Sequence, residues 1–533
     1  MTKLRSVKPK SILQFCAGWV LVSVLLFVQS SASGAGVTII THGLNSNVDD
    51  WVIAMADRMA HTGRLPGTTS TCYEIYFVST NSSYALAWKR LSGAAPTNTD
   101  SGEIFIKLDW RQLANNSYST FQVASMALPA LLQTNFIPEM GGHAIAELPL
   151  HMVGHSRGGS LICELSRLLG TNGIWVDHLT TLDPHPLNND GFSDFLYTVV
   201  DAPARTYENV LFHDNYYQRL DSFAFGEPVA GSCVRQITSL NGGYSGLGGA
   251  HSDVHLWYHG TVDTNTPLTD TAATITSSER QTWWNAFESA GLRAGFVYSL
   301  LGNGDRLSTN QPAGQGTSRI RDGYNQKWDL GAGNSVNNRT ALPANNGSWP
   351  SLITLRLGGS NLVAFGQSNS ISLSYQLAAT NLSNAVLGFY LDNDANPYNG
   401  NEQLIRQLTL PATGSNQVAF VNATLEWNAQ NVAPGEHLVF ARISRAGNAR
   451  YFYAPEKVTV LSSFQPPLVV INRLGAANIR VDAFGVPGQR LVFQGSTDFS
   501  HWQALSTNWF TSNLVSFSES AGISARFYRA FVR

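Results

Sequence analysis

Charged side chains are scarce in this sequence of 533 residues. Asp, Glu, Lys and Arg together make up 13 %, and the formal net charge at pH 7 is −2. Lys and Arg form no long run, whereas proteins that track a nucleic-acid backbone concentrate them on one face or stripe. This scarcity argues against nucleic acid as a partner. The hydrophobic content of 43 % is ample for packed cores and argues against general disorder.

Cysteine is also rare, with four in the whole chain. Cys16 falls within an N-terminal apolar run, and Cys72, Cys163 and Cys233 cannot all be paired because their number is odd. A disulfide between Cys72 and Cys233 is compatible with an oxidising compartment. Cys163 lies on an apolar helix, where a buried thiol is expected. None of the spacings is that of a zinc site.

Long hydrophobic runs are missing after the N-terminus. The one such run, residues 12–28, follows four Lys and Arg residues and precedes a stretch of small residues at 30–35. This order is typical of a secretory signal peptide, which we place at residues 1–35. A retained membrane anchor is the alternative, because the run is close to the minimum spanning length. We therefore expect a secreted or cell-surface protein.

Residues 36–301 alternate short β-branched or apolar runs with amphipathic stretches. This pattern predicts a doubly wound α/β fold, with a mostly parallel sheet flanked by helices. Strands are predicted at 37–41, 72–79, 103–109, 148–154, 176–182 and 208–213. Helices are predicted at 47–61, 118–133, 157–169 and 277–290.

The pattern changes in residues 302–349, whose Gly, Asn, Ser and Pro content predicts a linker. Residues 350–463 show period-two strands without helices, which fits an immunoglobulin-like β-sandwich. Residues 464–533 predict a small β-module, which resembles modules at the C-termini of exported bacterial proteins. These two all-β domains are candidates for attachment to a surface or a polysaccharide.

A catalytic motif lies where the predicted strand 148–154 meets the helix 157–169. Gly154-His155-Ser156-Arg157-Gly158 matches G-x-S-x-G in a strand-turn-helix context. In such an elbow the serine takes strained backbone angles, and the glycines leave room for the neighbouring strand and helix. The helix N-terminus then turns unpaired N–H groups toward the site of reaction. Ser156 is therefore the predicted nucleophile.

A second motif, His42-Gly43-Leu44, follows the first strand. Together with the elbow it resembles the lipases and esterases of the α/β-hydrolase superfamily. The resemblance implies an α/β-hydrolase fold and an oxyanion hole formed by the backbone N–H groups of Leu44 and Arg157. His42 is expected to hold its loop in place rather than to act as a base.

Two aspartates are candidates for the acid of a catalytic triad. Asp183 ends the strand 176–182 within Leu-Asp-Pro, which resembles the acid segment of pancreatic-type lipases. Asp214 lies one strand later, where most other members of the superfamily carry theirs. We favour Asp183, because an Asp followed by Pro forms a shaped turn, and the chain order Ser, Asp, His is met by either residue.

The base is expected to be a histidine downstream of the acid. A loop rich in glycine at 242–249 leads into His251, which we assign as the base. His255 and His259 are the alternatives, although later helical positions are more often packed. His185 and His213 are expected to line the rim of the site or to cap turns.

These assignments predict a secreted serine hydrolase that cleaves carboxylic esters through an acyl-enzyme on Ser156. The substrate would be a lipid or polymer ester, and no cofactor or catalytic metal is required. One alternative is an amidase or peptidase with the same triad. The other is a binding or adhesion protein whose hydrolase-like domain is inactive. The oligomeric state is left open.

Two features bear on the substrate. Arg157 stands where lipases commonly have an apolar residue, which would place a bulky cation near the mouth of the site. The apolar segment 121–132 could form an acyl-binding wall, but a helix that simply covers the sheet is the favoured interpretation.

One acidic segment lies in the predicted sandwich. Asp392 and Asp394 begin a run with oxygen ligands at alternating positions, a spacing that suits Ca²⁺. The run lacks the full EF-hand pattern. An Asx-rich hairpin turn is the favoured alternative to a structural Ca²⁺ site.

Overall fold

The computed structural model describes most of the chain after the N-terminal segment. The described residues are 35–60, 69–81, 83–115, 117–191, 194, 196–222, 224–262, 269–289, 296, 339–427, 432–461, 467–474, 478–485, 489–520 and 526–532. The predicted signal peptide and most of the predicted linker lie outside them. No helix within the described ranges is long and apolar enough to cross a membrane.

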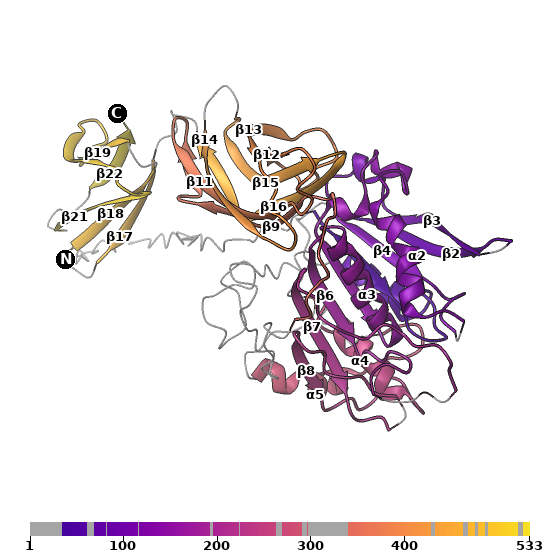
Figure 1. The fold of residues 1–533 in the computed structure, drawn as a ribbon. Helices are drawn as coiled ribbons and strands as arrows, with labels where there is room; N and C mark the ends of the chain where they lie inside the picture. Colours follow the sequence, from indigo (N-terminus) through magenta and orange to yellow (C-terminus); the bar gives the residue numbers. More distant parts are fainter. Residues whose placement is uncertain are drawn as a thin grey trace, which may run out of the picture. The chain divides into compact units, whose positions relative to one another are not determined.

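The N-terminal region is built on a mostly parallel sheet of eight strands in the order β3-β2-β4-β1-β5-β6-β7-β8 (Figure 1). Every neighbouring pair is parallel except β2 and β3. The strands are β1 Val37–Thr41, β2 Thr71–Ser79, β3 Tyr84–Ser92, β4 Ile104–Asp109, β5 Leu150–His155, β6 Val176–Leu182, β7 Val210–Gln218 and β8 Cys233–Ile237. Strands buried on both faces explain the nearly continuous apolar runs in the sequence.

Five helices accompany this sheet: α1 Trp51–Met59, α2 Thr120–Leu132, α3 Arg157–Thr171, α4 Gly249–His259 and α5 Ser277–Ser289. α2 and α3 pack side by side and share one apolar core with Ile39 of β1. α1, α4 and α5 share another core with Ile40. Because successive side chains of a strand point to opposite faces, these two cores lie on the two faces of the sheet. The predicted two-sided arrangement of helices around a mostly parallel sheet is therefore confirmed.

The element boundaries differ in places from those predicted. Two strands were missed: β3 is an edge strand with mixed exposure, and β8 is short. α1 begins at Trp51 rather than near residue 47, because Asn47 forms a turn in which its side chain accepts a hydrogen bond from the Asp49 N–H at 2.7 Å. α2 begins after a capping box in which Ser119 and Gln122 satisfy each other's backbone N–H groups.

Residues 351–461 form two antiparallel sheets that enclose an apolar core. One sheet has the order β10-β16-β15-β12-β13 and the other β14-β11-β9. β10 alone is paired in parallel. The strands are β9 Ser351–Gly358, β10 Leu362–Ala364, β11 Ser368–Gln376, β12 Ala385–Asp392, β13 Gln403–Leu410, β14 Ala419–Glu426, β15 Gly435–Arg445 and β16 Asn448–Leu461. This is the two-sheet β domain that the period-two pattern predicts.

The two-sheet domain is joined to the parallel-sheet region by buried polar contacts. The fully buried guanidinium of Arg450 donates hydrogen bonds to the backbone oxygens of Ala146, Leu148 and Trp175 at 2.6, 2.8 and 3.0 Å. Apolar residues of β15 and β16 belong to the same core as those of α2 and α3. Because a buried guanidinium is costly unless its donors are satisfied, these bonds fix the contact between the two regions.

The acidic segment that suggested Ca²⁺ lies at this contact. Asp392 accepts hydrogen bonds from the N–H groups of Asn393 and Asp394 at 2.6 and 3.2 Å, and Tyr453 donates to its other oxygen. The Asn396 side chain donates to backbone oxygens of the parallel-sheet region. No group of three or more His, Cys, Asp or Glu suited to a metal occurs among the described residues. These contacts fit an Asx-rich turn better than a Ca²⁺ site.

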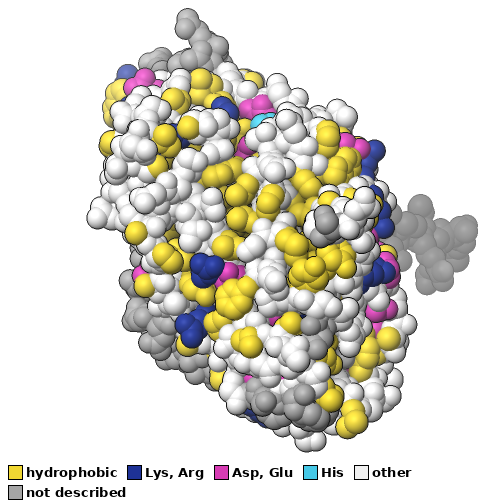
Figure 2. Space-filling model, turned by 45° about the vertical axis from the view of Figure 1, so that its right-hand side comes forward, with side chains coloured by type: hydrophobic (Ala, Val, Ile, Leu, Met, Phe, Trp, Pro, Cys, Tyr) yellow, Lys and Arg dark blue, Asp and Glu magenta, His cyan; other side chains and the backbone are white. Residues whose placement is uncertain are grey.

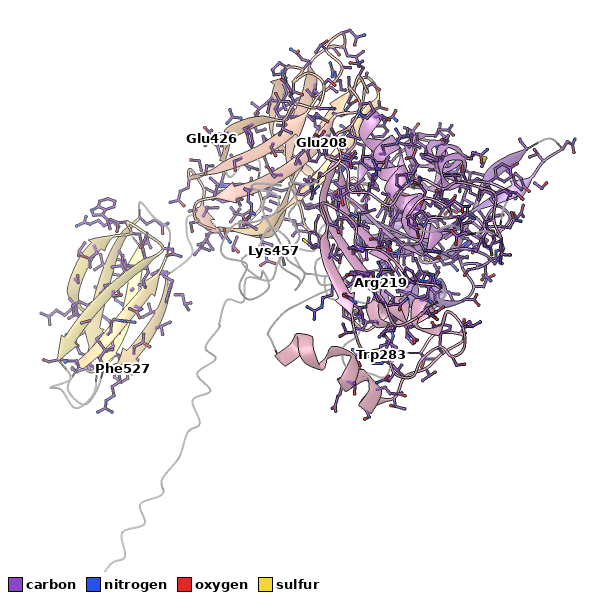
Figure 3. All side chains as sticks on the ribbon, turned by 60° about the horizontal axis from the view of Figure 1, so that its bottom comes forward. Glu208, Arg219, Trp283, Glu426, Lys457 and Phe527 are labelled. Atoms are coloured by element: carbon purple, nitrogen blue, oxygen red, sulfur yellow. The ribbon has the colours of Figure 1, made fainter. Side chains whose placement is uncertain are left out.

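The C-terminal module consists of two three-stranded antiparallel sheets in the orders β17-β18-β21 and β20-β19-β22. The strands are β17 Leu468–Arg473, β18 Asn478–Phe484, β19 Arg490–Ser496, β20 Gln503–Trp509, β21 Leu514–Ser520 and β22 Phe527–Val532. Its core is small. The ring of Phe527, labelled in Figure 3, lies 3.5 Å from that of Phe499, and the guanidinium of Arg529 lies over the Trp502 ring at 4.2 Å.

The possible disulfide between Cys72 and Cys233 does not form, and both cysteines are buried. Cys72 is on β2 and Cys233 on β8, six strand spacings apart in the sheet, or about 29 Å at about 4.8 Å each. A disulfide needs its Cα atoms within about 7 Å. Cys163 is a buried thiol, as expected, and burial raises its pKa to about 12.

Candidate active site

Ser156 stands alone between β5 and α3, in a sharp turn. Its backbone angles are φ 56° and ψ −127°, a strained conformation for a residue other than glycine. A side chain on Gly154 would overlap the carbonyl oxygen of Gly158, and one on Gly158 would overlap that of His42. Both glycines of the motif are therefore required by close backbone packing, and the predicted elbow is present.

The loop after β1 packs directly against the nucleophile. A Cβ on Gly43 would lie 2.7 Å from the Cβ of Ser156. His42 is buried beneath the loop, where its ring stacks on Trp110 at 5.5 Å and its Nε2 lies 3.2 Å from a carboxylate oxygen of Asp109. These contacts fit the structural role predicted for His42. Leu44 lines the same cavity as Ser156, and Arg157 is the first residue of α3, where N–H groups lack an intrahelical partner.

Asp183 directly follows β6 with φ 46° and is fully buried. Its carboxylate accepts four hydrogen bonds: from the backbone and side-chain N–H of Gln218, from the Gly226 N–H, each at 2.8 Å, and from Nδ1 of His251 at 2.6 Å. A Cβ on Gly226 would lie 2.5 Å from this carboxylate, so only glycine allows the close approach. The first three donors hold the carboxylate in place for the fourth.

His251 is the third residue of α4, immediately after the glycine-rich loop. Because Nδ1 is bonded to Asp183, the remaining ring nitrogen, Nε2, is available for the cavity that His251 lines together with Ser156. The loop is folded back on α4, where the Asp253 carboxylate accepts a hydrogen bond from the Tyr244 N–H at 2.8 Å. Gly243 has φ 73°, and a side chain on it would overlap that carboxylate.

His155, the residue before Ser156, is hydrogen-bonded to the backbone of His251. Its Nε2 donates a hydrogen bond of 2.8 Å to the backbone oxygen of His251, which fixes the proton on Nε2 because a carbonyl only accepts. Burial lowers the pKa of His155 well below its ordinary value, so the ring stays neutral. The backbone of the nucleophile is thereby tied to the backbone of the base.

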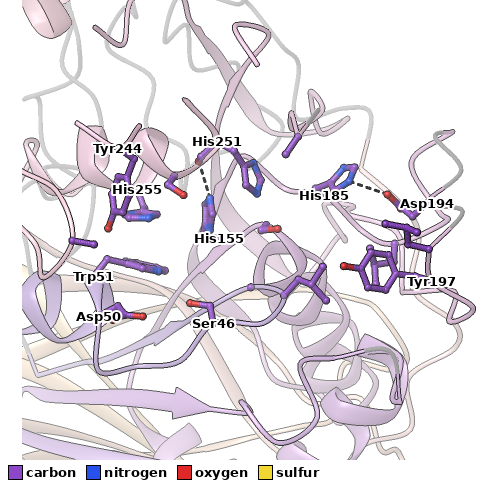
Figure 4. A pocket seen from close by; sticks show the side chains of 18 of the residues that line it. Ser46, Asp50, Trp51, His155, His185, Asp194, Tyr197, Tyr244, His251 and His255 are labelled. Atoms are coloured by element: carbon purple, nitrogen blue, oxygen red, sulfur yellow. Dashed lines mark hydrogen bonds and ion pairs between the residues drawn. The ribbon is translucent and has the colours of Figure 1, made fainter. Parts of the chain in front are cut away.

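Ser156 and His251 open into one cavity of about 470 Å³. Figure 4 shows Asp50, Trp51, Tyr244 and His255 gathered on one side of His251. His185, Asp194 and Tyr197 lie on the other side. A substrate can therefore extend in two directions from the nucleophile. None of the described residues in the cavity wall belongs to α2, so the favoured interpretation of 121–132, a helix that covers the sheet, is confirmed over an acyl-binding wall.

The alternative acid and base residues have other partners. Asp214 is buried within β7 and bonded to His178 at 2.8 Å and to the hydroxyl of Thr180 at 2.6 Å. His255 is buried and stacked on Trp51 at 4.5 Å.

The remaining candidate histidines are His259, His213 and His185, and they differ in whether they line the cavity. His259 is buried on α4 and does not line the cavity. His213 is buried between Thr181 and Thr206, away from the rim, and burial lowers its pKa to about 3. His185 does line the cavity, as expected of a rim residue.

The predicted cation at the mouth is wrong. The Arg157 side chain is fully buried and pairs with both carboxylate oxygens of Asp201 at 2.6 and 2.7 Å. Its other donors reach backbone oxygens of Ala114, Asn115 and Tyr118. Arg157 thus points away from the cavity and ties the loop after β4 to the back of the elbow, because a buried guanidinium needs every donor satisfied.

Sequence reasoning missed several residues that hold the site. Gln218 orients the acid, Asp201 receives Arg157, and Trp51 forms part of the cavity wall. Gln218 and Asp201 lie tens of residues from their partners and in no motif, so the sequence carries no signal for them. His155 is within the motif itself, but its role depends on where α4 lies.

Comparison with known proteins gives little guidance. No family model matches the sequence, and a comparison with curated proteins gives no match. Among solved structures, the human OSCAR ligand-binding domain aligns with 33 % of this chain and 87 % of its own, at 11 % identity and a TM-score of 0.18. The CARDB domain of a Pyrococcus furiosus protein aligns with 21 % and 90 %, at 11 % identity and a TM-score of 0.14. A superoxide reductase from Ignicoccus hospitalis aligns with 21 % and 82 %, at 10 % identity and a TM-score of 0.14.

Proposed function

We propose that this chain is an exported serine hydrolase of the α/β-hydrolase type that cleaves carboxylic esters. The observation that carries the proposal is the 2.6 Å contact between His251 and Asp183 at the cavity into which Ser156 faces from its strained elbow. The three residues come from separate elements, β5 with α3, the end of β6 and the start of α4, in the chain order Ser, Asp, His.

In the proposed reaction, Nε2 of His251 takes the proton of the Ser156 hydroxyl as its oxygen attacks the ester carbonyl carbon. Asp183 holds the imidazole by Nδ1 and stabilises its positive charge. The Leu44 and Arg157 N–H groups receive the oxyanion. The imidazolium then protonates the leaving alcohol. Water, deprotonated by the same imidazole, attacks the acyl-enzyme and releases the carboxylic acid.

The sheet supports this proposal because it brings Ser156, Asp183 and the loop that carries Leu44 to one edge. β1, β5 and β6 are parallel and in register, so the loop after β1, the elbow after β5 and Asp183 after β6 all lie beyond their carboxyl ends. Ligands of open parallel sheets bind at that edge.

The decisive experiment is labelling of the full chain with a fluorophosphonate, which reacts with activated serines. We expect wild-type protein to be labelled and Ser156→Ala to be unlabelled, with equal folding by circular dichroism. Failure of folded wild-type protein to react would instead support a binding protein with an inactive hydrolase-like domain.

Hydrolysis of p-nitrophenyl esters of graded acyl length, compared with the matching p-nitroanilides, then tests the bond that is cleaved. We expect ester turnover to exceed anilide turnover. Anilide turnover without a preference for esters would replace the ester hydrolase with an amidase or peptidase.

A further inference from the structure

The cavity has a carboxylate that the proposed mechanism does not use. Asp50 lines one end of the cavity and occupies the N-cap position of α1, where aspartate usually accepts a hydrogen bond from the helix. The Asp50 side chain makes no such bond. Among the described residues, its one side-chain hydrogen bond is a long one of 3.4 Å from the Thr271 hydroxyl. The carboxylate is thus turned away from its own helix and toward the cavity (Figure 4).

No cationic side chain balances Asp50 within the described part of the chain. The neighbouring Asp49 differs, because Arg111 pairs with it at 2.7 Å. Asp194, at the other end of the cavity, lies 3.4 Å from Nε2 of His185. No Lys or Arg occurs among the described residues of the cavity wall. No Lys or Arg among the described residues therefore pairs with the Asp50 carboxylate at this end of the cavity.

Aromatic side chains lie at the same end of the cavity as Asp50. Trp51 and Tyr244 line the same end of the cavity. The Tyr244 hydroxyl donates a short hydrogen bond to Asp270, so Tyr244 offers the cavity mainly its ring. Burial raises the pKa of Tyr244, and the carboxylates of Asp270 and Asp50 raise it further, which places this end in a negative field. A carboxylate beside aromatic rings attracts an alkyl-ammonium group by charge and by cation–π contact.

From this arrangement we infer that the end of the cavity lined by Asp50, Trp51 and Tyr244 is a subsite for a quaternary or alkyl ammonium group of the ester substrate. The inference rests on the proposed esterase function and narrows it from esters in general to those with a cationic group. Esters with a phosphate or a second carboxylate are disfavoured at this end, because they would meet Asp50 with like charge.

The test compares two butyrate esters of the same shape that differ only in charge. One is the choline ester, and the other is the neohexyl ester, in which a carbon replaces the quaternary nitrogen. Acid release is followed in a pH-stat. We expect wild-type kcat/KM to favour the choline ester by roughly fivefold to tenfold. The preference should fall toward unity in Asp50→Asn and persist in Asp49→Asn, the matched neighbour outside the cavity.

The choline ester carries its cation in the alcohol part of the substrate. A binding measurement without any substrate also detects a subsite that would take a cation from the acyl part. Binding of tetramethylammonium chloride to the full chain is titrated calorimetrically, with sodium chloride at equal ionic strength as the control. We expect saturable binding that Asp50→Asn weakens about tenfold and Asp49→Asn does not.

The outcomes separate this inference from the proposed function. Turnover of the neohexyl ester with no preference for choline, together with no saturable binding of tetramethylammonium, overturns the cationic subsite and leaves the esterase standing. A preference or binding that Asp50→Asn does not change also overturns it, because the cation would then bind elsewhere. If neither ester is hydrolysed and Ser156 is not labelled, the esterase fails, and the titration alone decides the subsite.

Discussion

Two Asp–His pairs stand on neighbouring strands of the sheet, and only one of them belongs to the proposed active site. Asp183 is bonded to His251 at 2.6 Å and Asp214 to His178 at 2.8 Å; both aspartates and His178 are buried, and His251 is partly exposed. Asp183 lies beyond the end of β6, in a turn, and its histidine comes from another element that reaches the cavity. Asp214 lies inside β7, and its histidine is on the adjacent strand. The two pairs therefore share a short carboxylate–imidazole contact and differ in place, because His251 lines the cavity and His178 does not.

The largest difference between the two pairs is expected in kcat when each aspartate is replaced by asparagine. We expect Asp183→Asn to lower kcat by on the order of 10³ to 10⁴-fold, because an amide can neither hold the reactive tautomer of His251 nor stabilise its cation. Asp214→Asn should lower kcat far less. The measurement is steady-state turnover of a p-nitrophenyl ester by both variants. A larger loss in Asp214→Asn would reverse the assignment of the acid.

Stability tests whether the Asp214–His178 pair is structural. Asp214 accepts from Thr180, Tyr216 and His178 inside the sheet, and an amide there would turn a donor toward other donors. We expect Asp214→Asn to lower the free energy of unfolding by about 1–3 kcal/mol in urea titrations. An unfolding midpoint equal to that of wild type would show that this pair is not structural.

A finer distinction concerns His155, which anchors His251 by its backbone. We expect His155→Leu to lower kcat about tenfold with little change in KM, because the donor to the His251 carbonyl is lost. His155→Gln, which keeps an N–H donor, should recover part of kcat. If the two variants are equally impaired, the ring fills space and does not position the base.

The smallest expected effect concerns Asp253, which lies on the same helix as His251. Burial raises the pKa of Asp253 to about 7, and Asp270 and Glu279 add to the shift. Since the folded-state pKa is above the unfolded one, the Asp253 contribution to stability is present below about pH 4 and lost as pH rises through about 7. Asp253→Asn should therefore be more stable than wild type at about pH 8, on the order of 1–2 kcal/mol, and similar to it at about pH 4. Thermal melts at the two pH values measure this difference. If the difference in stability between Asp253→Asn and wild type is the same at both pH values, Asp253 does not titrate in this range.

The sequence was most informative where structure follows from local chemistry. The elbow glycines, the positive-φ turn at Asp183 and the glycine loop before His251 each have a short-range signature. The three site residues could therefore be named and ordered from the sequence. The contact between Asp183 and His251 could not, because it depends on where β6 and α4 lie in the fold.

Long-range partners account for the errors. The Arg157 side chain was predicted to lie near the mouth of the cavity, because no residue near it in the sequence indicates that Asp201 is its partner. Cys72 and Cys233 looked available to each other because strand order in a sheet is not sequence order. The edge strand β3 was missed because its partly exposed residues do not show the continuous apolar run of the central strands.

Arg450 joins the regions that lie before and after residues 302–349 by direct hydrogen bonds. This residue lies in the second region, yet its guanidinium serves as the hydrogen-bonding partner of carbonyl groups that precede β5 and β6 in the first. A chain that ends before residue 350 would lack Arg450, the donor to those carbonyls. It would also expose to solvent the apolar residues that are buried in the shared core. We therefore expect the region before residue 302 to be less stable when it is produced without the two-sheet domain.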